Sequence, residues 1–225
     1  NQFSKFFDIK NINNFRNNQL LSHGCDDGDK FASFLDLKEL IKDWSLDEKF
    51  LIKNLSKKNV GNSNASHKFL DYFLDYTELK HIKFYLHIRD KIKNDIKSIC
   101  EIGGGFGSLA RIFLNQFNSK YILIDLPEAN LISTYFLYNH FLNKKFFLYD
   151  NFIQEVQDNK FKIDENYFDK YDIFILPPWT IDFFEKIKIN MFINTYSFME
   201  MKKVTIKKYF DFIHKHSKIG TYFLN

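Results

Sequence analysis

From Ile96 onward, short apolar runs of strand length alternate with segments whose apolar residues recur at helical spacing. The runs predict six strands, at residues 98–103, 120–125, 145–150, 171–177, 191–196 and 220–224. Helices are predicted in most of the gaps, including one over residues 108–115. Regular alternation of strands and helices is typical of an α/β fold, in which a mostly parallel sheet carries helices on both faces.

The first part of the chain has a different pattern. Residues 34–55 and 67–92 carry apolar residues at helical spacing, and the polar stretch "KKNVGNSNAS" separates them. The first 30 residues have weak periodicity, which predicts loop and short turns. We therefore expect a helical N-terminal cap over residues 1–95, on the substrate side, and a Rossmann-like α/β domain over residues 96–225.

Composition and charge exclude several classes of protein. The 225 residues carry a formal net charge of +4, with lysines interleaved among acids, so charge alone gives no reason to expect a nucleic-acid partner. Cys25 and Cys100 fit neither a disulfide framework nor a zinc site. The cysteine usage therefore favours a reducing cytoplasm. No apolar run is long enough to span a bilayer and no signal peptide is visible.

The stretch "ICEIGGGFGSLARIFL" holds four of the eight glycines within residues 103–107. Gly103, Gly105 and Gly107 form G-x-G-x-G between a predicted strand, which contains Glu101, and a predicted helix. Glycines at such a junction allow a tight turn and bring backbone N–H groups close to a ligand at the helix N-terminus. The pattern therefore predicts a nucleotide-like ligand.

The glycine pattern is compatible with two kinds of ligand. The dinucleotide fingerprint G-x-G-x-x-G/A, begun at Gly103, would place Ser108 at its last position and give no role to Gly107 or Glu101. The observed E-x-G-x-G-x-G resembles motif I of class I S-adenosylmethionine-dependent methyltransferases, which implies S-adenosyl-L-methionine as cofactor. An NAD oxidoreductase stays open as an alternative.

Polar residues follow the next predicted strands at the same edge of the sheet. Asp125, followed by Leu126, ends "YILIDLPEAN", where a carboxylate can accept hydrogen bonds from both ribose hydroxyls. Asp150 ends the following strand and Asn151 comes next, where the methyltransferase resemblance implies adenine contacts. Pro177 lies just past the fourth strand. The predicted cofactor-binding set is Glu101, Gly103, Gly105, Gly107, Asp125, Leu126, Asp150, Asn151 and Pro177.

The turn "ILPPWTI" resembles the [D/N]-P-P-[Y/F/W] motif of amino-methyltransferases, in which a polar first residue holds the amine. Here that position is Leu176, which cannot take the hydrogen bond. Nitrogen methylation, including methylation of nucleic-acid bases, is therefore disfavoured and stays an alternative. We expect Trp179 to form a wall of the pocket, which excludes water from the sulfonium.

Four segments in this order are similar to a family of sugar O-methyltransferases found with bacterial capsule and lipopolysaccharide genes: "ICEIGGGFGSLA", "YILIDLPEAN", "LPPW" and "FINTYSFMEM". The resemblance covers residues 96–225, and a weaker similarity is present upstream in "NNFRNN" and "NVGNSNAS". It implies methyl transfer to a sugar hydroxyl, on a nucleotide-activated sugar or a glycan, during polysaccharide synthesis. "NTYSFMEM" is its distinctive part and supplies Asn194, Ser197 and Glu200.

Methylation of a sugar hydroxyl requires a base, because the hydroxyl is a weak acid. Glu200 is the first candidate, followed by His67 and His140. Asn194 and Ser197 are expected to orient the sugar. A helix cap or a salt bridge is the alternative for Glu200, and a surface position is the alternative for His140.

Two further residues are predicted to contact the substrate. Arg16 and Trp179 complete the predicted substrate-binding set with Asn194 and Ser197. A planar guanidinium suits a carboxylate or phosphate, and a solvated surface position is the alternative for Arg16. "HGCDDGD" lacks the register of a calcium loop, so no metal site is predicted. A cofactor-binding partner subunit without activity, and a homo-oligomer, both stay open.

Overall fold

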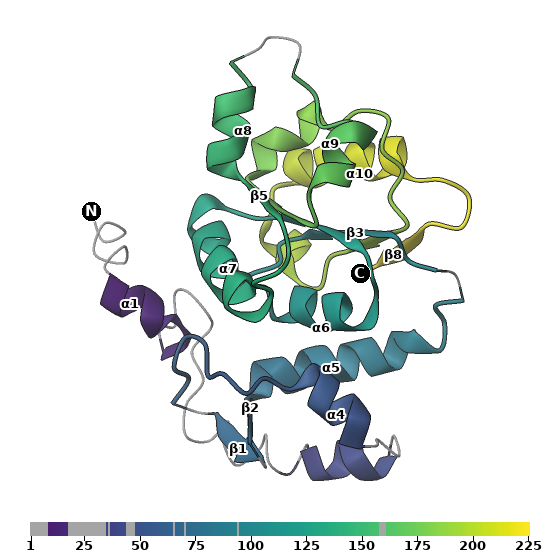
Figure 1. The fold of residues 1–225 in the computed structure, drawn as a ribbon. Helices are drawn as coiled ribbons and strands as arrows, with labels where there is room; N and C mark the ends of the chain where they lie inside the picture. The colour runs from purple at the N-terminus through teal and green to yellow at the C-terminus, as the bar shows by residue number, and fades with distance from the viewer. Residues whose placement is uncertain are drawn as a thin grey trace. The chain divides into compact units, whose positions relative to one another are not determined.

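The computed structural model describes residues 9–17, 35, 37–43, 48–64, 66–69, 71–93, 95–157 and 161–225. These residues form two compact units (Figure 1). One consists of the described residues of Asn1–Asn94 together with Phe106–Gln116 and Tyr135–His140. The other, here called the sheet unit, consists of Asp95–Gly105, Phe117–Thr134 and Phe141–Asn225.

The sheet unit contains a six-stranded sheet in the order β5-β6-β4-β3-β7-β8. Every pair of neighbouring strands is parallel. The strands are β3 (Ser98–Ile102), β4 (Lys120–Ile124), β5 (Phe146–Leu148), β6 (Ile173–Leu176), β7 (Met191–Ile193) and β8 (Tyr222–Leu224). All six lie within the predicted strands, and the predicted α/β fold with a mostly parallel sheet is confirmed.

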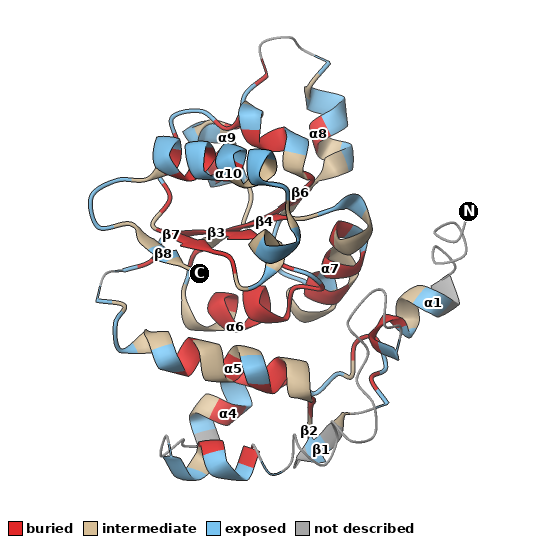
Figure 2. Cartoon of the chain, turned by 180° about the vertical axis from the view of Figure 1, so that it is seen from behind, coloured by how far each residue is buried: buried red, intermediate tan, exposed pale blue. Residues whose placement is uncertain are grey.

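Helices cover the sheet unit from both faces (Figures 1 and 2). α8 (Tyr149–Glu155), α9 (Glu165–Lys170) and α10 (Lys203–His216) lie on one face, and α7 (Pro127–His140) begins on the other. Alternate residues of the strands, among them Cys100, Ile122 and Phe174, pack with Phe212 of α10 in one core cluster. β3 is buried along its whole length, as expected for a parallel strand covered on both faces.

The strand order places β6 beside β4 and β7 beside β3. The amide of Asp125 therefore lies next to the end of β6 and donates to the carbonyl of Leu176, with a distance of 3.3 Å. Two short 3₁₀ helices follow strands at the carboxyl edge: η3 (Pro178–Phe183) after β6 and η4 (Ser197–Glu200) after β7. The sheet thus gathers its predicted ligand-binding turns at one edge.

The other unit is mainly helical. It contains α1 (Ile9–Asn13), η2 (Phe15–Asn17), a helical stretch at residues 37–43, α4 (Glu48–Asn54), α5 (Tyr76–Arg89) and α6 (Ser108–Gln116). The prediction of helix from residue 67 is wrong at its start, because β1 (His67–Phe69) and β2 (Tyr72–Leu74) form an antiparallel pair. Burial alternates along β2, and the helix begins only where the Asp75 carboxylate accepts from the Glu78 amide at 3.0 Å.

Candidate functional site

The glycine loop after β3 has a backbone that only glycine adopts easily. Gly103, Gly105 and Gly107 have φ values of +76°, +55° and +90°. A Cβ atom on Gly103 would lie 2.1 Å from the Ser197 Oγ, so no larger residue fits there. The Gly103 amide donates to the Ile124 carbonyl at 2.8 Å, which fixes the loop on the end of β4.

Beneath the loop lies a buried carboxyl group, Glu101, which is 2% exposed. The Tyr121 hydroxyl donates to its Oε2 at 2.8 Å. Burial raises the pKa of Glu101 to about 7, although the hydrogen bond from Tyr121 acts in the opposite direction. A Cβ atom on Gly104 would lie 3.0 Å from the same Oε2 and 2.7 Å from Leu123 Cγ. The sequence prediction missed Tyr121 and Gly104, and the run of three glycines was the only signal for the latter.

Asp125 joins the loop to the end of β4. Its Oδ2 accepts from the Gly105 amide and its Oδ1 from the Leu126 amide, each at 2.7 Å. Burial raises the pKa of Asp125, and these two N–H groups oppose the increase. A carboxylate has about four lone-pair positions, so the two amides leave acceptor capacity for two neighbouring hydroxyl groups.

Asp150 and Asn151 lie in the first turn of α8, because β5 ends two residues earlier than predicted. Asp150 is exposed, whereas the Asn151 Oδ1 accepts from the Leu148 amide at 2.9 Å. The Pro177 carbonyl accepts from the Thr180 hydroxyl at 2.8 Å. These contacts form the turns that follow β5 and β6.

Leu126 and Trp179 are among the large apolar side chains exposed at this edge of the sheet. Leu126 is 61% exposed and Trp179 is 49% exposed. The Trp179 indole N–H donates to the Tyr149 hydroxyl at 3.2 Å, and the two rings meet edge to face. Trp179 is thus available as a wall for a ligand, and its support by Tyr149 was not predicted.

Asn194 and Ser197, both predicted to orient a sugar, bind the last residue of β3, just before the glycine loop. The Asn194 side-chain amide donates to the Ile102 carbonyl at 2.9 Å and to the Ser197 Oγ at 2.5 Å. The Ser197 hydroxyl donates to the same carbonyl at 3.2 Å. Both side chains hold the end of β3, and contact with a sugar stays a prediction. Glu200 is exposed at the end of η4, and its charge contributes to the raised pKa of Asp125.

His140 belongs to the other unit, where both ring nitrogens have partners. Its Nδ1 lies 2.8 Å from the Phe136 carbonyl and its Nε2 lies 2.8 Å from the Ser56 Oγ. Burial lowers the pKa of His140 to about 4. The backbone of His67 lies in β1, and its side chain is outside the described part of the structure. The role of either residue as a base stays a prediction.

Arg16 is 4% exposed, so the solvated surface position considered for it is wrong. It forms an ion pair with Asp75 and lies 3.9 Å from the Glu78 carboxylate. Glu78 also pairs with Arg111 at 3.1 Å. Two of the three arginines are therefore held in one buried cluster with two acids, a feature that the sequence pattern did not reveal.

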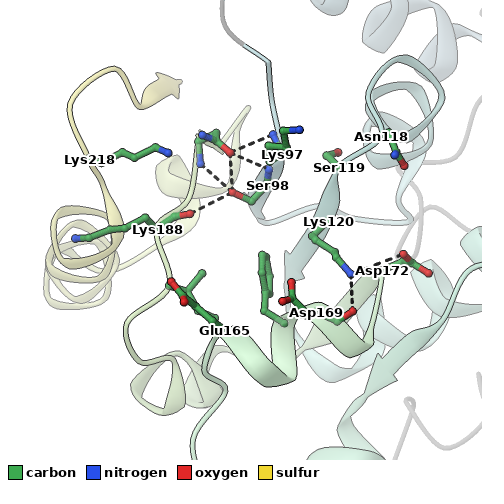
Figure 3. A pocket seen from close by; sticks show the side chains of 13 residues that line it. Lys97, Ser98, Asn118, Ser119, Lys120, Glu165, Asp169, Asp172, Lys188 and Lys218 are labelled. Atoms are coloured by element: carbon green, nitrogen blue, oxygen red, sulfur yellow. Dashed lines mark hydrogen bonds and ion pairs between the residues drawn. The ribbon is translucent and has the colours of Figure 1, made fainter.

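A cavity of about 560 Å³ lies at the opposite, amino edge of the sheet (Figure 3). Four lysines and three acids line it together: Lys97, Lys120, Lys188, Lys218, Glu165, Asp169 and Asp172. Lys120 donates to two backbone carbonyls and so does Lys188. Lys120 and Lys188 therefore stabilise the backbone around the cavity. Because positive and negative side chains are mixed in its lining, the cavity favours no particular ligand.

Metal and membrane features are absent from the residues that the structure describes. No group of three or more candidate metal ligands occurs among them, and none of their helices has the length and apolarity that a bilayer span requires. Cys100 is buried and free, and burial raises its pKa. Cys25 and the segment "HGCDDGD" lie outside the described residues.

No protein-family model and no curated protein matches the chain. Among solved structures, the glycopeptide N-methyltransferase MtfA complexed with sinefungin is similar, with 11% identity and a TM-score of 0.39 over 65% of this chain and 48% of that one. Coclaurine N-methyltransferase bound to N-methylheliamine and SAH has 15% identity and a TM-score of 0.35 over 92% of this chain and 57% of that one. The chain spans about half the length of each protein. Similarities at this level carry no argument about function, and the fold assignment rests on the parallel sheet itself.

Proposed function

We propose that the chain is an S-adenosylmethionine-dependent methyltransferase that transfers a methyl group to a sugar hydroxyl. The observation that carries the proposal is the pairing of the glycine loop with Asp125, where the Gly105 amide donates to the carboxylate at 2.7 Å. Both lie at the carboxyl ends of adjacent parallel strands, the edge at which open α/β sheets bind ligands.

The residues at this edge fit the cofactor. Asp125 retains acceptor capacity for the two ribose hydroxyls, and Asp150 with Asn151 follows the strand where an adenine ring would lie. The exposed side chains of Leu126 and Trp179 offer apolar surface to the adenine and the sulfonium. Glu101, Gly103, Gly107 and Pro177 shape the turns that surround them. The bound cofactor would supply a methyl group activated by the positive sulfur.

Glu200 is the proposed base. It is exposed, and it lies close enough to Asp125 to influence the charge of that carboxylate. Its carboxylate would accept the proton of the acceptor hydroxyl as the oxygen forms its bond to the methyl carbon. His67 and His140 remain the further candidates, and Arg16, Trp179, Asn194 and Ser197 the candidates for substrate contact.

The sugar acceptor is supported by the resemblance of "FINTYSFMEM" to the sugar O-methyltransferases, which implies a role in polysaccharide synthesis. An amine or base acceptor would need a polar residue at the start of "LPPW". Leu176 is apolar and fully buried in β6, so its side chain offers no hydrogen bond to an amine.

Calorimetry followed by a transfer assay tests the proposal. We expect S-adenosylmethionine and S-adenosylhomocysteine to bind more tightly than NAD. With methyl-labelled cofactor, label should appear on members of a panel of nucleotide sugars and oligosaccharides, and not on amines or nucleic acid. Preferential binding of NAD would contradict the cofactor, and label on nucleic acid or amines alone would contradict the acceptor. Cofactor binding with no label on any acceptor would favour a non-catalytic subunit.

A further inference from the structure

The short helix η4 carries Ser197 at its first position and Glu200 at its last. A 3₁₀ helix has three residues per turn, so side chains three positions apart lie on the same face. Ser197 and Glu200 therefore share one face of η4. Because the Ser197 hydroxyl donates to the end of β3, this face is directed toward the carboxyl edge of the sheet. Glu200 lies close enough to Asp125 for its charge to add to the effect of burial on the pKa of Asp125.

Asn194, the residue that follows β7, joins η4 to β3. Its side-chain amide donates to the Ile102 carbonyl at 2.9 Å and to the Ser197 Oγ at 2.5 Å. Its Oδ1 accepts from the Phe198 amide at 3.3 Å. A Cβ atom on Gly103 would overlap the Ser197 side chain, so η4 is packed tightly against the backbone there. The start of η4 is thus held on the end of β3 by contacts within the sheet unit.

The Asn194 side chain has little capacity left for a ligand. It is 1% exposed, and both hydrogens of its side-chain amide are donated within the protein. A buried side chain whose donors are satisfied is suited to holding backbone in place.

We propose that Asn194 and Ser197 are positioning residues, which hold Glu200 at a fixed distance from the cofactor by joining η4 to the end of β3. A base must lie within hydrogen-bond reach of the acceptor hydroxyl while that hydroxyl is aligned with the methyl group. A displacement of about 1 Å is enough to lower the rate strongly. The proposal rests on the proposed function, which supplies the cofactor and the role of Glu200 as base.

The glycine loop has supports of its own. The Gly103 amide donates to the Ile124 carbonyl at 2.8 Å, and the Gly105 amide donates to the Asp125 carboxylate at 2.7 Å. Neither bond involves the side chains at positions 194 and 197. Their removal should therefore lower turnover and leave cofactor affinity nearly unchanged.

The chain offers a control of the same kind at the other end of β7. Asn190 precedes this strand, and its Oδ1 accepts from the amides of Lys97 and Ser98 at 3.1 Å each, at the start of β3. Asn190→Ala and Asn194→Ala thus remove equivalent side chains from opposite edges of the sheet.

In the transfer assay, Asn194→Ala should lower kcat about tenfold. Its KM for the acceptor and its affinity for S-adenosylhomocysteine should stay within about twofold of the original, as should kcat of Asn190→Ala, even where the unfolding midpoint of the control falls as far. Equal losses of kcat in the two variants would overturn the proposal. A raised KM with unchanged kcat in Asn194→Ala would also overturn it, in favour of a sugar contact.

A double variant shows whether Ser197 acts through Glu200. Ser197→Ala removes the hydroxyl that donates to the Ile102 carbonyl and keeps the Cβ atom. If Ser197 acts through the base, Ser197→Ala combined with Glu200→Gln should turn over no more slowly than Glu200→Gln alone. Losses that multiply independently would overturn the proposal.

Hydrogen exchange of the ligand-free protein provides a readout that requires no cofactor. The Met199 and Met201 amides, which donate to the carbonyls of Tyr196 and Phe198, should exchange faster in Asn194→Ala than in the original chain, and unchanged in the control. If the original chain binds no S-adenosylhomocysteine, the proposed function fails, and this experiment still decides whether Asn194 holds η4. Equal exchange in the original chain and Asn194→Ala would overturn that role.

Discussion

Glu101 should make the free energy of unfolding depend on pH. Burial raises its pKa from 4.5 to about 7 in the folded chain. The folded state therefore binds this proton more tightly than the unfolded state does, which stabilises the fold. The stabilisation is complete below pH 4.5 and is lost as the pH rises to about 7. At roughly 1.4 kcal/mol for each pKa unit, the loss amounts to about 3 kcal/mol.

The substitution Glu101→Gln isolates this effect. Glutamine keeps the size of the side chain and an oxygen that accepts from the Tyr121 hydroxyl, but it does not titrate. Urea unfolding of both chains from pH 4 to pH 8 should show the original chain losing about 3 kcal/mol relative to the variant. The comparison is necessary because His81 and His140, whose pKa values burial lowers to about 4, make stability rise over part of the same range. Their contributions are common to both chains and cancel.

A second substitution checks that the pH dependence comes from the Glu101 carboxyl group. Tyr121→Phe removes the hydroxyl that stabilises the ionised Glu101, so the pKa of Glu101 should rise further and the pH window should extend upward. The reasoning is refuted if the difference in unfolding free energy between the original chain and Glu101→Gln is the same at every pH. Such a result would mean that Glu101 has the same pKa in both states.

Four further substitutions test other parts of the molecule. Asp125→Ala should weaken cofactor binding by about 1 to 3 kcal/mol in calorimetry, because two ribose hydroxyls lose an acceptor; unchanged affinity would remove Asp125 from the site. Glu200→Gln should leave cofactor affinity intact and lower kcat by about 100-fold or more in the transfer assay, and normal turnover would exclude it as base. Gly103→Ala should destabilise the fold by more than Gly105→Ala, which should cost about 1 kcal/mol in urea unfolding, because a Cβ atom on Gly103 collides with Ser197 and one on Gly105 meets nothing within 4 Å. Equal costs would contradict that packing. Arg111→Met should cost about 3 to 5 kcal/mol in the same assay, since Glu78 would lose a partner in a buried site; a change below about 1 kcal/mol would show that the pair contributes little.

The sheet and the residues at its carboxyl edge could be predicted because the sequence signals for them are local. Glycines, an acid at the end of a strand and a proline after it report conformations within a few residues, so Gly103, Asp125 and Pro177 could be placed from the sequence. The ends of strands were less certain: Asp150 falls in a helix because the Asn151 side chain accepts from the Leu148 amide and starts the turn early.

Contacts between distant segments could not be predicted. Asn194 was predicted at the end of its strand, but its bond to the Ile102 carbonyl follows from the pairing of β3 with β7, which no local pattern specifies. Arg16 was recognised as unusual, yet its burial depends on Asp75, 59 residues away. The antiparallel pair at residues 67–74 was missed because its short apolar run also fits a helix.

The neighbour of β3 in the sheet has a consequence for how the protein is made. β3 lies in the middle of the sheet, but the strand that completes its second edge, β7, is synthesised some 90 residues later, as the pairing of Cys100 with Phe192 shows. Until Met191 has left the ribosome, the buried apolar strand exposes a row of unpaired N–H and carbonyl groups. A nascent chain stalled in this interval would carry an aggregation-prone edge, so rapid translation between β4 and β7 would favour its yield.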